Sequence, residues 1–459
     1  MRLPLELAAS VTQAKLVDRK AAPSTLRVCT DTRSLEPGDT FLALRGEHFD
    51  GHDFVTEAVQ RGAAMLVIDD ERRRPAGAAA MIVNDAKAAY LRLAGAARAL
   101  FEGSVIAITG SAGKTTTKDF LAQLLAERYT GRVLAAARNE NNEIGVSKLL
   151  LALSNREHDV AVVEMGARHY GDIAALVEIA RPQFGILTNV GEAHLEIMGS
   201  RTRLEETKWA LFAHGARAIL NAADAVSRRR APSLDAVPHW FAADLSSVET
   251  RADLEVLTAF AGPNRLVHRR GARALEFDVA VSVPGAHNRA NLAAATAGAL
   301  ELGVAPERLI DAIARVRLPE GRYDRISIGG GIALIYDAYN ANASSMIAAL
   351  DAFAAEAAAR RIAVLASMAE LGVESKTLHE RVGEHAAAFV DVLLLRGEYA
   401  TDVARGAQRA GLDADRIVRV ETNAQAVAWL RAHARADDLV LLKGSRKYKL
   451  EEIVEELRS

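Results

Sequence analysis

The sequence predicts an α/β protein with three domains: a small mixed α/β domain over residues 1–102, a central domain with a doubly wound parallel sheet over residues 103–316, and a Rossmann-like domain over residues 317–459. A chain of 459 residues, half of them hydrophobic, is too long for one hydrophobic core. Short apolar runs alternate with helical stretches in two separate series, which predicts the two larger sheets. Polar, turn-forming segments at residues 102–104 and 318–321 separate the parts.

The amino-terminal part has a shorter and more mixed pattern. Turn-forming motifs interrupt its apolar runs at Asp31-Thr32-Arg33, Glu36-Pro37-Gly38-Asp39 and Gly51-His52-Asp53-Phe54. Such frequent turns favour a small α/β domain over a long regular sheet.

The two larger domains are predicted from apolar strands separated by helices. In the central domain we expect strands at residues 105–109, 160–164, 184–190 and 216–220, with helices at 114–128, 171–180 and 202–213. In the last domain we expect strands at residues 332–336, 362–366, 392–395, 417–420 and 439–442. Near-continuous apolar strands are typical of parallel sheets covered on both faces, and ligands bind at the carboxyl ends of such strands.

The composition excludes several classes of partner. Lys and Arg together number 57 against 59 Asp and Glu, so no excess charge favours nucleic acid or an anionic membrane. Cys29 is the single cysteine, which suits a reducing compartment, and the first residues lack the basic and apolar stretches of an export signal. No run of about 18 apolar residues occurs that would insert into a membrane. We expect a cytoplasmic monomer.

The strand at 105–109 runs into a predicted phosphate-binding loop, or P-loop. Its sequence is Gly110-Ser111-Ala112-Gly113-Lys114-Thr115-Thr116, and the first glycine of the general motif is absent because Ile108 stands there. The glycines let the backbone approach phosphates, and the free N–H groups of the following helix point at the anion. Lys114 is expected to reach the outer phosphates and Thr115 to ligate Mg²⁺. The sequence therefore predicts ATP or GTP binding by these seven residues.

Two side chains after neighbouring strands are candidate metal ligands. Glu164 ends the strand 160–164, where a buried carboxylate is explained by a bound cation such as Mg²⁺ or, alternatively, by a helix N-cap. His194 follows the next strand and belongs at the same edge, although an isolated histidine is more often structural.

The local pattern predicts a surface position for Lys208. It lies on the predicted helix at 202–213, three residues after Glu205, so the residues alone favour a surface ion pair between the two.

Further motifs identify a family. They are Asn141-Asn142-Glu143-Ile144-Gly145, Glu164-Met165-Gly166-Ala167, Gly191-Glu192-Ala193-His194, Asp337-Ala338-Tyr339-Asn340-Ala341-Asn342 and Lys443-Gly444-Ser445-Arg446. With the amino-terminal turns they resemble, over nearly the whole chain, the Mur ligases, the ATP-dependent amide-forming enzymes of peptidoglycan synthesis. The resemblance is to the branch that adds D-alanyl-D-alanine to UDP-N-acetylmuramoyl-tripeptide.

The resemblance implies a role for each matching residue. Catalysis would involve Lys114, Glu164, His194, Lys208 and Arg322; Mg²⁺ would be held by Thr115, Glu164, His194 and a carbamylated Lys208. On the ATP side, Asn288 and Asn291 would lie at the adenine, Arg322 at a phosphate and Asp337 at the ribose. Substrate would be contacted by Thr32, Arg33, Gly51 and His52 at the UDP-sugar, and by Asn142, Tyr339, Asn340 and Asn342 elsewhere.

Alternatives remain for several of these roles. The residues alone allow helix capping for Asn288 and Asn291, and an interdomain pair for Arg322 and Asp337. Three residues depart from the family pattern, namely Ala210, Ala343 and Ser367, which replace glutamate, proline and aspartate. The other functions considered are a Mur ligase that adds a diamino acid and a nucleotide-binding protein without turnover.

The resemblance also implies a reaction sequence. The tripeptide carboxylate would attack the γ-phosphate of ATP to give an acyl phosphate, because a carboxylate oxygen leaves readily only as phosphate. The amine of D-alanyl-D-alanine would then attack that carbon, and the domains would close to exclude water.

Overall fold

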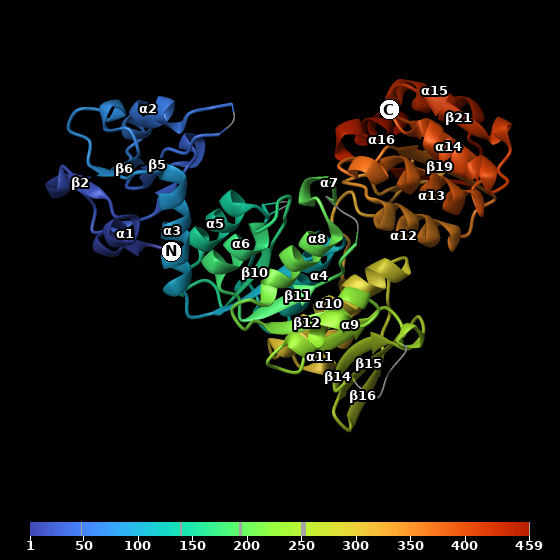
Figure 1. The fold of residues 1–459 in the computed structure, drawn as a ribbon, viewed down its shortest axis with the longest axis horizontal. Coiled ribbons are helices and arrows are strands. Elements are labelled where there is room, and N and C mark those ends of the chain that lie inside the picture. The colour runs from blue at the N-terminus through green and yellow to red at the C-terminus, as the bar shows by residue number, and fades with distance from the viewer. Residues whose placement is uncertain (47, 138–139, 192–194, 249–253, 459) are drawn as a thin grey trace.

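The computed structural model describes residues 1–46, 48–137, 140–191, 195–248 and 254–458. Its elements form an elongated α/β molecule with the amino-terminal part at one end and the carboxyl-terminal part at the other (Figure 1). Four sheets are present in the described residues, with nine, six, five and two strands. The predicted fold class, with several parallel-sheet units, is confirmed.

The amino-terminal part is built on a five-stranded sheet. Its order is β2 (Lys15–Val17), β7 (Ala80–Ile82), β6 (Met65–Ile68), β5 (Thr40–Leu42) and β4 (Val28–Cys29), and β1 (Leu3–Pro4) pairs separately with β3 (Thr25–Leu26). The helices are α1 (Leu5–Thr12), α2 (Val55–Gln60) and α3 (Ala86–Ala99). Only β2 runs antiparallel to its neighbour in the larger sheet. Helix α3 shares one hydrophobic core with the central part.

The central part contains the nine-stranded sheet. Its order is β16 (Arg273–Asp278), β15 (Arg265–Arg270), β14 (Val256–Phe260), β13 (His239–Ala242), β12 (Arg217–Asn221), β11 (Phe184–Leu187), β8 (Ser104–Thr109), β10 (Val160–Glu164) and β9 (Val133–Ala135). The helices are α4 (Lys114–Leu125), α5 (Glu143–Ala152), α6 (Asp172–Ala180), α7 (Leu195–Met198), α8 (Arg201–Trp209), α9 (Ala225–Arg230), α10 (Ala286–Glu301) and α11 (Pro306–Arg315).

This sheet is longer than the sequence predicted. The strands from β9 to β14 are parallel as expected, but β15 and β16 add an antiparallel hairpin at one edge. The strand expected at 184–190 ends at Leu187, because the following residues turn to meet the P-loop. The helix expected at 202–213 ends at Trp209 and continues as a 3₁₀ turn, Ala210–Phe212.

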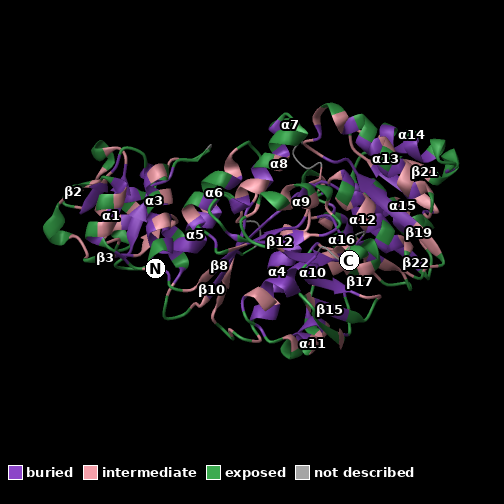
Figure 2. Ribbon diagram, turned by 60° about the horizontal axis from the view of Figure 1, so that its bottom comes forward, coloured by how far each residue is buried: buried purple, intermediate pink, exposed green. Residues whose placement is uncertain are grey.

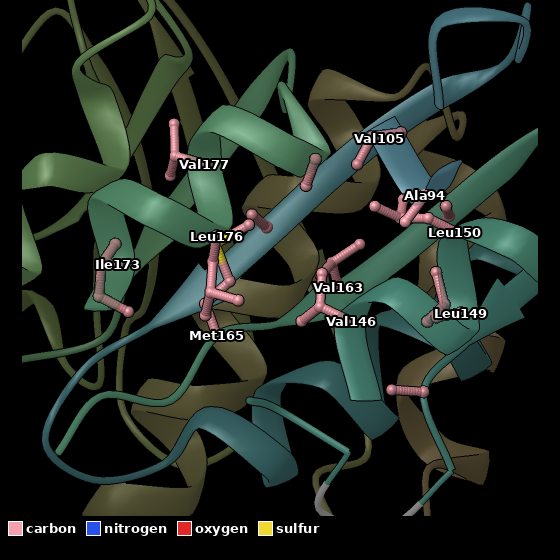
Figure 3. Packing of buried hydrophobic residues seen from close by; sticks show 14 of the residues in the cluster. Ala94, Val105, Val146, Leu149, Leu150, Val163, Met165, Ile173, Leu176 and Val177 are labelled. Atoms are coloured by element: carbon pink, nitrogen blue, oxygen red, sulfur yellow. The ribbon is translucent and has the colours of Figure 1, made fainter. Parts of the chain in front are cut away.

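The middle strands are buried on both faces. Along β8, Val105 and Ala107 belong to one hydrophobic cluster, whereas Ile106 and Ile108 belong to the cluster on the opposite face. This alternation follows from the two-residue period of a strand and explains the continuous apolar run in the sequence. Figure 3 shows Val146, Leu149 and Leu150 of α5 and Leu176 of α6 packed over this sheet, against Val163 of β10 and Met165, which follows that strand.

The carboxyl-terminal part is built on the six-stranded sheet. Its order is β17 (Asp324–Ser327), β18 (Ala333–Tyr336), β22 (Asp438–Lys443), β19 (Arg360–Ala366), β20 (Val392–Arg396) and β21 (Ile417–Val420). The helices are α12 (Ala343–Ala354), α13 (Ser375–Ala387), α14 (Ala400–Arg409), α15 (Asn423–His433) and α16 (Glu451–Arg458). Separate cores lie on its two faces, and the strands and inner helix faces are buried in Figure 2. No helix in the described ranges is long and apolar enough to cross a bilayer.

A buried polar network joins the end of α10 to the sheet. His239 on β13 lies 2.9 Å from Glu301 through Nδ1 and 2.8 Å from Thr258 through Nε2, and Thr258 also meets His268 at 3.0 Å. Arg270 donates to Glu301 at 2.6 Å. Burial and the neighbouring His239 lower the pKa of His268 to about 4. Burial would raise the pKa of Glu301, but hydrogen bonds and charge from His239 and Arg270 lower it to about 2.

These shifts predict a loss of stability in mild acid. Between pH 6.5, the ordinary pKa of histidine, and pH 4, the unfolded chain holds a proton on residue 268 that the folded chain does not, so stability falls as the pH falls through this window. Between pH 7.5 and 5.5 His268 should account for a loss of about 1 kcal/mol. His268→Gln should remove that part of the pH dependence in urea unfolding, while His214→Gln, at an exposed position, should not. Equal pH dependence in both variants would contradict this explanation.

Candidate nucleotide and metal site

The P-loop lies at the carboxyl end of β8, as the sequence predicted. Strand β8 ends at Thr109 and α4 begins at Lys114, with Gly113 as the N-cap residue at a φ of 82°. A Cβ at Gly113 would collide with the side chain of Asn291, so the loop can lie against α10 only with glycine there. The backbone N–H groups at the start of α4 therefore remain available to an anion.

The segment after β11 fixes the shape of this loop. Asn189 accepts a hydrogen bond from the Ala112 N–H through Oδ1 at 3.0 Å, and its carbonyl accepts one from the Ser111 N–H at 3.0 Å. Thr188 donates to the Ala112 carbonyl at 2.6 Å. Sequence reasoning assigned no role to Asn189, although its place directly after a strand at the carboxyl edge of the sheet was a usable signal.

Lys114 points back along the loop. Its Nζ donates to the Gly110 carbonyl at 2.8 Å. Burial lowers the pKa of Lys114, Glu164 opposes that shift, and Arg322 adds to it. A bound phosphate would supply a second negative charge and favour the protonated lysine. The position thus suits an anion.

Glu164 is a buried carboxylate with one unused oxygen. The residue is 1% exposed at the end of β10, and Asn141 donates to its Oε1 at 2.8 Å. Its Oε2 has no hydrogen-bond partner among the described residues. The N-cap alternative is wrong, because the next helix begins at Asp172 with Gly171 as its cap. A buried carboxylate oxygen without a donor fits a hard cation such as Mg²⁺, with Thr115 as a further oxygen ligand.

Lys208 is buried, which excludes the surface alternative. It is 1% exposed on α8, and Glu205 pairs instead with Arg229 at 2.5 Å. Burial lowers the pKa of Lys208 well below its usual range, and the positive charge of Lys114 lowers it further, while Asp172 partly opposes this. The neutral amine is therefore favoured. His194, the other ligand expected nearby, lies outside the described residues.

The carboxyl-terminal part reaches the P-loop through Arg322. Its Nη2 lies 3.5 Å from Thr115 Oγ1, and its guanidinium carbon lies 4.6 Å from the centre of the Tyr339 ring. Within the described ranges the ion-pair partner of Asp337 is Lys443 of the same sheet, which donates to its Oδ2 at 2.8 Å. The interdomain alternative is thus wrong for Asp337, whereas Arg322 does contact the central part.

The adenine-side candidates lie on α10. Asn288 donates to the Pro284 carbonyl at 3.0 Å, and Asn291 accepts from Thr117 Oγ1 of the P-loop helix at 3.4 Å. The cap of α10 is Gly285, so neither asparagine is an N-cap residue. The role of both at the nucleotide stays a prediction.

The residues expected to bind the UDP-sugar differ in their exposure to solvent. Arg33 has an exposed side chain that pairs with Asp31 at 2.6 Å, whereas Thr32 is buried. His52 is 1% exposed, shares a hydrogen bond with Asp50 Oδ1 at 2.7 Å, and accepts from the Asp69 N–H at 3.3 Å. The His52 ring therefore organises the turn that contains Gly51, and the substrate role of these four residues stays a prediction.

Three substrate candidates also have structural roles. Asn142 caps α5 by accepting from the Gly145 N–H at 2.9 Å, and Asn342 caps α12 by accepting from the Ser345 N–H at 2.9 Å. Asn340 accepts from the Ala341 N–H at 2.9 Å. The two caps fix the starts of α5 and α12, and the substrate role of all three residues stays a prediction.

A cavity of about 780 Å³ lies between the central and carboxyl-terminal parts. Its lining includes Glu196, Arg201, Glu370, Glu374, Tyr399 and Lys447. Arg201 and Glu374 approach to 3.6 Å across it. Groups of both charge signs therefore surround this space.

Models of known protein families match most of the chain. Residues 27–129 match the model of the Mur ligase family catalytic domain, residues 108–299 the Mur ligase middle domain, and residues 321–446 the Mur ligase glutamate ligase domain.

Comparison with individual proteins matches nearly the full length. UDP-N-acetylmuramoyl-tripeptide–D-alanyl-D-alanine ligase of a Synechocystis species is 37% identical, over 94% of this chain and 91% of that protein. The enzyme of the same name from Escherichia coli is 33% identical over 98% of both chains.

Comparison with solved structures also finds similarity over nearly the full length of the chain. A MurF crystal structure from Acinetobacter baumannii has a TM-score of 0.85 and 28% identity, covering 100% of this chain and 99% of that one. The MurF ligase of Thermotoga maritima in complex with ADP has a TM-score of 0.79 and 25% identity, covering 94% of this chain and 97% of that one.

The unused oxygen of Glu164 predicts opposite effects with and without metal. In EDTA, Glu164→Gln should raise the melting temperature by about 2 °C or more, because it removes a buried negative charge that has a hydrogen-bond donor on only one of its two oxygens. With ADP and Mg²⁺ the parent protein should gain more stability than the variant, because only the parent retains the ligand. Thermal unfolding followed by circular dichroism would measure both. A variant that is destabilised in EDTA and fully stabilised by Mg²⁺ would exclude Glu164 as a ligand.

Proposed function

The chain belongs to the Mur ligase family and is an ATP-dependent ligase that forms a C–N bond, and we propose that it joins D-alanyl-D-alanine to the terminal carboxylate of UDP-N-acetylmuramoyl-tripeptide. The observation that carries this proposal is the full-length similarity to ligases of that name, at 33% and 37% identity. The P-loop, the buried Glu164 and the buried Lys208 supply the groups that such a reaction needs. The product would be a peptidoglycan precursor.

Activation of the tripeptide would take place at the P-loop. The tripeptide carboxylate attacks the γ-phosphorus of ATP, the bond to the bridging oxygen breaks, and ADP leaves with formation of an acyl phosphate. Lys114 and Arg322 stand beside Thr115 and would neutralise the charge that builds up on the transferred phosphate. Bound at Glu164 and Thr115, Mg²⁺ would add its own charge at the phosphates.

Amide formation would follow in the cavity between the domains. The amine of the dipeptide attacks the acyl carbon, phosphate leaves, and the amine loses a proton. We propose that the dipeptide binds in this cavity, since free D-alanyl-D-alanine has both an ammonium and a carboxylate, and the lining offers carboxylates and the cations Arg201 and Lys447. Ser367, where the family has aspartate, accepts from the Tyr399 N–H at 3.0 Å beside this lining.

Lys208 would act as a carbamate. Its neutral Nζ would attack CO₂, form a C–N bond and release one proton, which leaves an anionic carboxylate on the side chain. Burial supports this reaction, because it favours the neutral amine, and Lys114 adds a cation that attracts the product anion. The carbamate oxygens would then assist Glu164 and His194 in holding Mg²⁺.

The three segments would divide the work. Residues 1–102 would bind the UDP-sugar, residues 103–316 the phosphates and metal, and residues 317–459 the ribose, through Asp337, and the acceptor. The contact of Arg322 with Thr115 supports cooperation between the last two segments. A single cysteine and the need for ATP support a cytoplasmic location.

Phosphate release from ATP tests the proposed reaction. Turnover should require both UDP-tripeptide and D-alanyl-D-alanine, and mass spectrometry should find the pentapeptide product. Assays with lysine and with diaminopimelate at the third position would identify the tripeptide. Lys114→Ala should lower turnover by about 100-fold or more in a folded protein.

Two other results would contradict the proposal. Turnover with a UDP-N-acetylmuramoyl-dipeptide as the carboxylate substrate and a free diamino acid as the amine would identify a different Mur ligase. Nucleotide binding without product from any acceptor would indicate a protein that has lost turnover.

Replacement of Lys208 tests the carbamate. Lys208→Ala should fold and lose about 100-fold or more of its turnover, bicarbonate should not restore it, and short carboxylic acids should restore part of it by supplying the missing oxygens. Lys15→Ala, at an exposed lysine paired with Glu71, is the matched control and should keep parental turnover. Near-parental turnover of Lys208→Ala at low CO₂ would show that no carbamate is needed.

A further inference from the structure

We propose that Asn141 is a positioning residue for the metal site, whose side-chain amide orients Glu164 so that one carboxylate oxygen is left for the cation. The inference rests on the proposed function, because it assumes a divalent ion at Glu164. The observation behind it is an asymmetry within one carboxylate. Asn141 donates to Oε1 at 2.8 Å, whereas Oε2 is buried without a hydrogen-bond partner among the described residues.

The backbone on both sides of this contact is fixed. The Gly166 N–H donates to the Asn141 carbonyl at 2.8 Å, so the two residues are linked by main-chain and side-chain bonds together. The Met165 N–H donates to the Ile108 carbonyl at 2.8 Å, and Thr109 donates to the Met165 carbonyl at 2.8 Å. Glu164 and its neighbours are therefore held against β8, the strand that leads into the P-loop.

The residue directly after Asn141 is also fixed. Asn142 caps α5 by accepting from the Gly145 N–H at 2.9 Å. The start of α5 and the segment after β10, through the Gly166 N–H, thus both hold the backbone at Asn141.

An amide suits this position better than a charged donor. A lysine or arginine on Oε1 would neutralise Glu164 and weaken its attraction for a divalent cation, whereas the neutral amide of Asn141 fixes the carboxylate and leaves its charge. Loss of a hydrogen bond to a ligating group commonly weakens metal binding about 10-fold to 100-fold. Asn141 itself need not touch metal or substrate.

Gly166 offers a second way to disturb the same contact. A Cβ at residue 166 would lie 2.7 Å from Oδ1 of Asn141, so alanine there must displace the amide without removing it. Gly166→Ala and Asn141→Ala should therefore have effects in the same direction. Asn155→Ala is the matched control, because that asparagine bonds to the Leu100 carbonyl near the opposite end of β10.

The test is binding of Mn²⁺ to the full-length protein saturated with ADP, followed by electron paramagnetic resonance of free Mn²⁺, with no turnover involved. Asn141→Ala and Gly166→Ala should each bind Mn²⁺ at least about 10-fold more weakly than the parent. Both variants should stay folded with a lower melting temperature, because Oε1 of the buried carboxylate loses its donor. Their affinity for ADP in EDTA should stay close to the parental value, and Asn155→Ala should match the parent in its affinity for both ADP and Mn²⁺. A merely structural asparagine would lower the affinity for ADP in EDTA together with that for Mn²⁺.

The outcomes separate the two proposals. Parental Mn²⁺ affinity in both variants, or in Gly166→Ala if Asn141→Ala fails to fold, would overturn the role of Asn141 and leave the proposed reaction intact. Failure of the parent protein itself to bind Mn²⁺ with ADP would overturn the metal site and this inference with it.

Discussion

The structure depends on charged groups that are buried at one sheet edge and neutralise each other only in part. Glu164 keeps an oxygen without a hydrogen-bond donor in the described part of the chain, and burial drives Lys114 and Lys208 toward their neutral forms. Such an arrangement is unfavourable by itself, since a buried charge needs a partner. In the proposed function a metal and a phosphate would supply the missing charges.

The fold provides the rigidity that this arrangement needs. Strands β8 and β10 are packed on both faces, and the parallel register brings the P-loop and Glu164 to the same edge. Hydrogen bonds that Asn189 accepts from the loop shape it, and Asn141 orients the carboxylate. Arg322 then adds a cation from a different part of the chain, which makes the site dependent on the approach of two domains.

The sequence predicted the parts of the site that depend on local pattern. The P-loop, the strands before it and the position of Glu164 follow from apolar runs and a glycine turn, which act over a few residues. The antiparallel hairpin β15–β16 was missed although it is local, since only residues 271 and 272 separate its strands. The burial of Lys208 and the pairing of Asp337 with Lys443, by contrast, depend on packing between distant segments. The hydrophobic periodicity of the sequence does not predict such contacts. For Lys208 the local pattern favoured a surface ion pair with Glu205, which is wrong.

Anomalous diffraction from crystals grown with ADP and Mn²⁺ would test the central claim most directly. The account predicts a manganese peak in contact with Oε2 of Glu164 and close to Thr115, while Asn141 remains bonded to Oε1. A structure with ADP in the P-loop, no manganese at Glu164, and the carboxylate paired with Lys114 or Lys208 would contradict it. In that case the buried charges would neutralise one another, and the metal site would not exist.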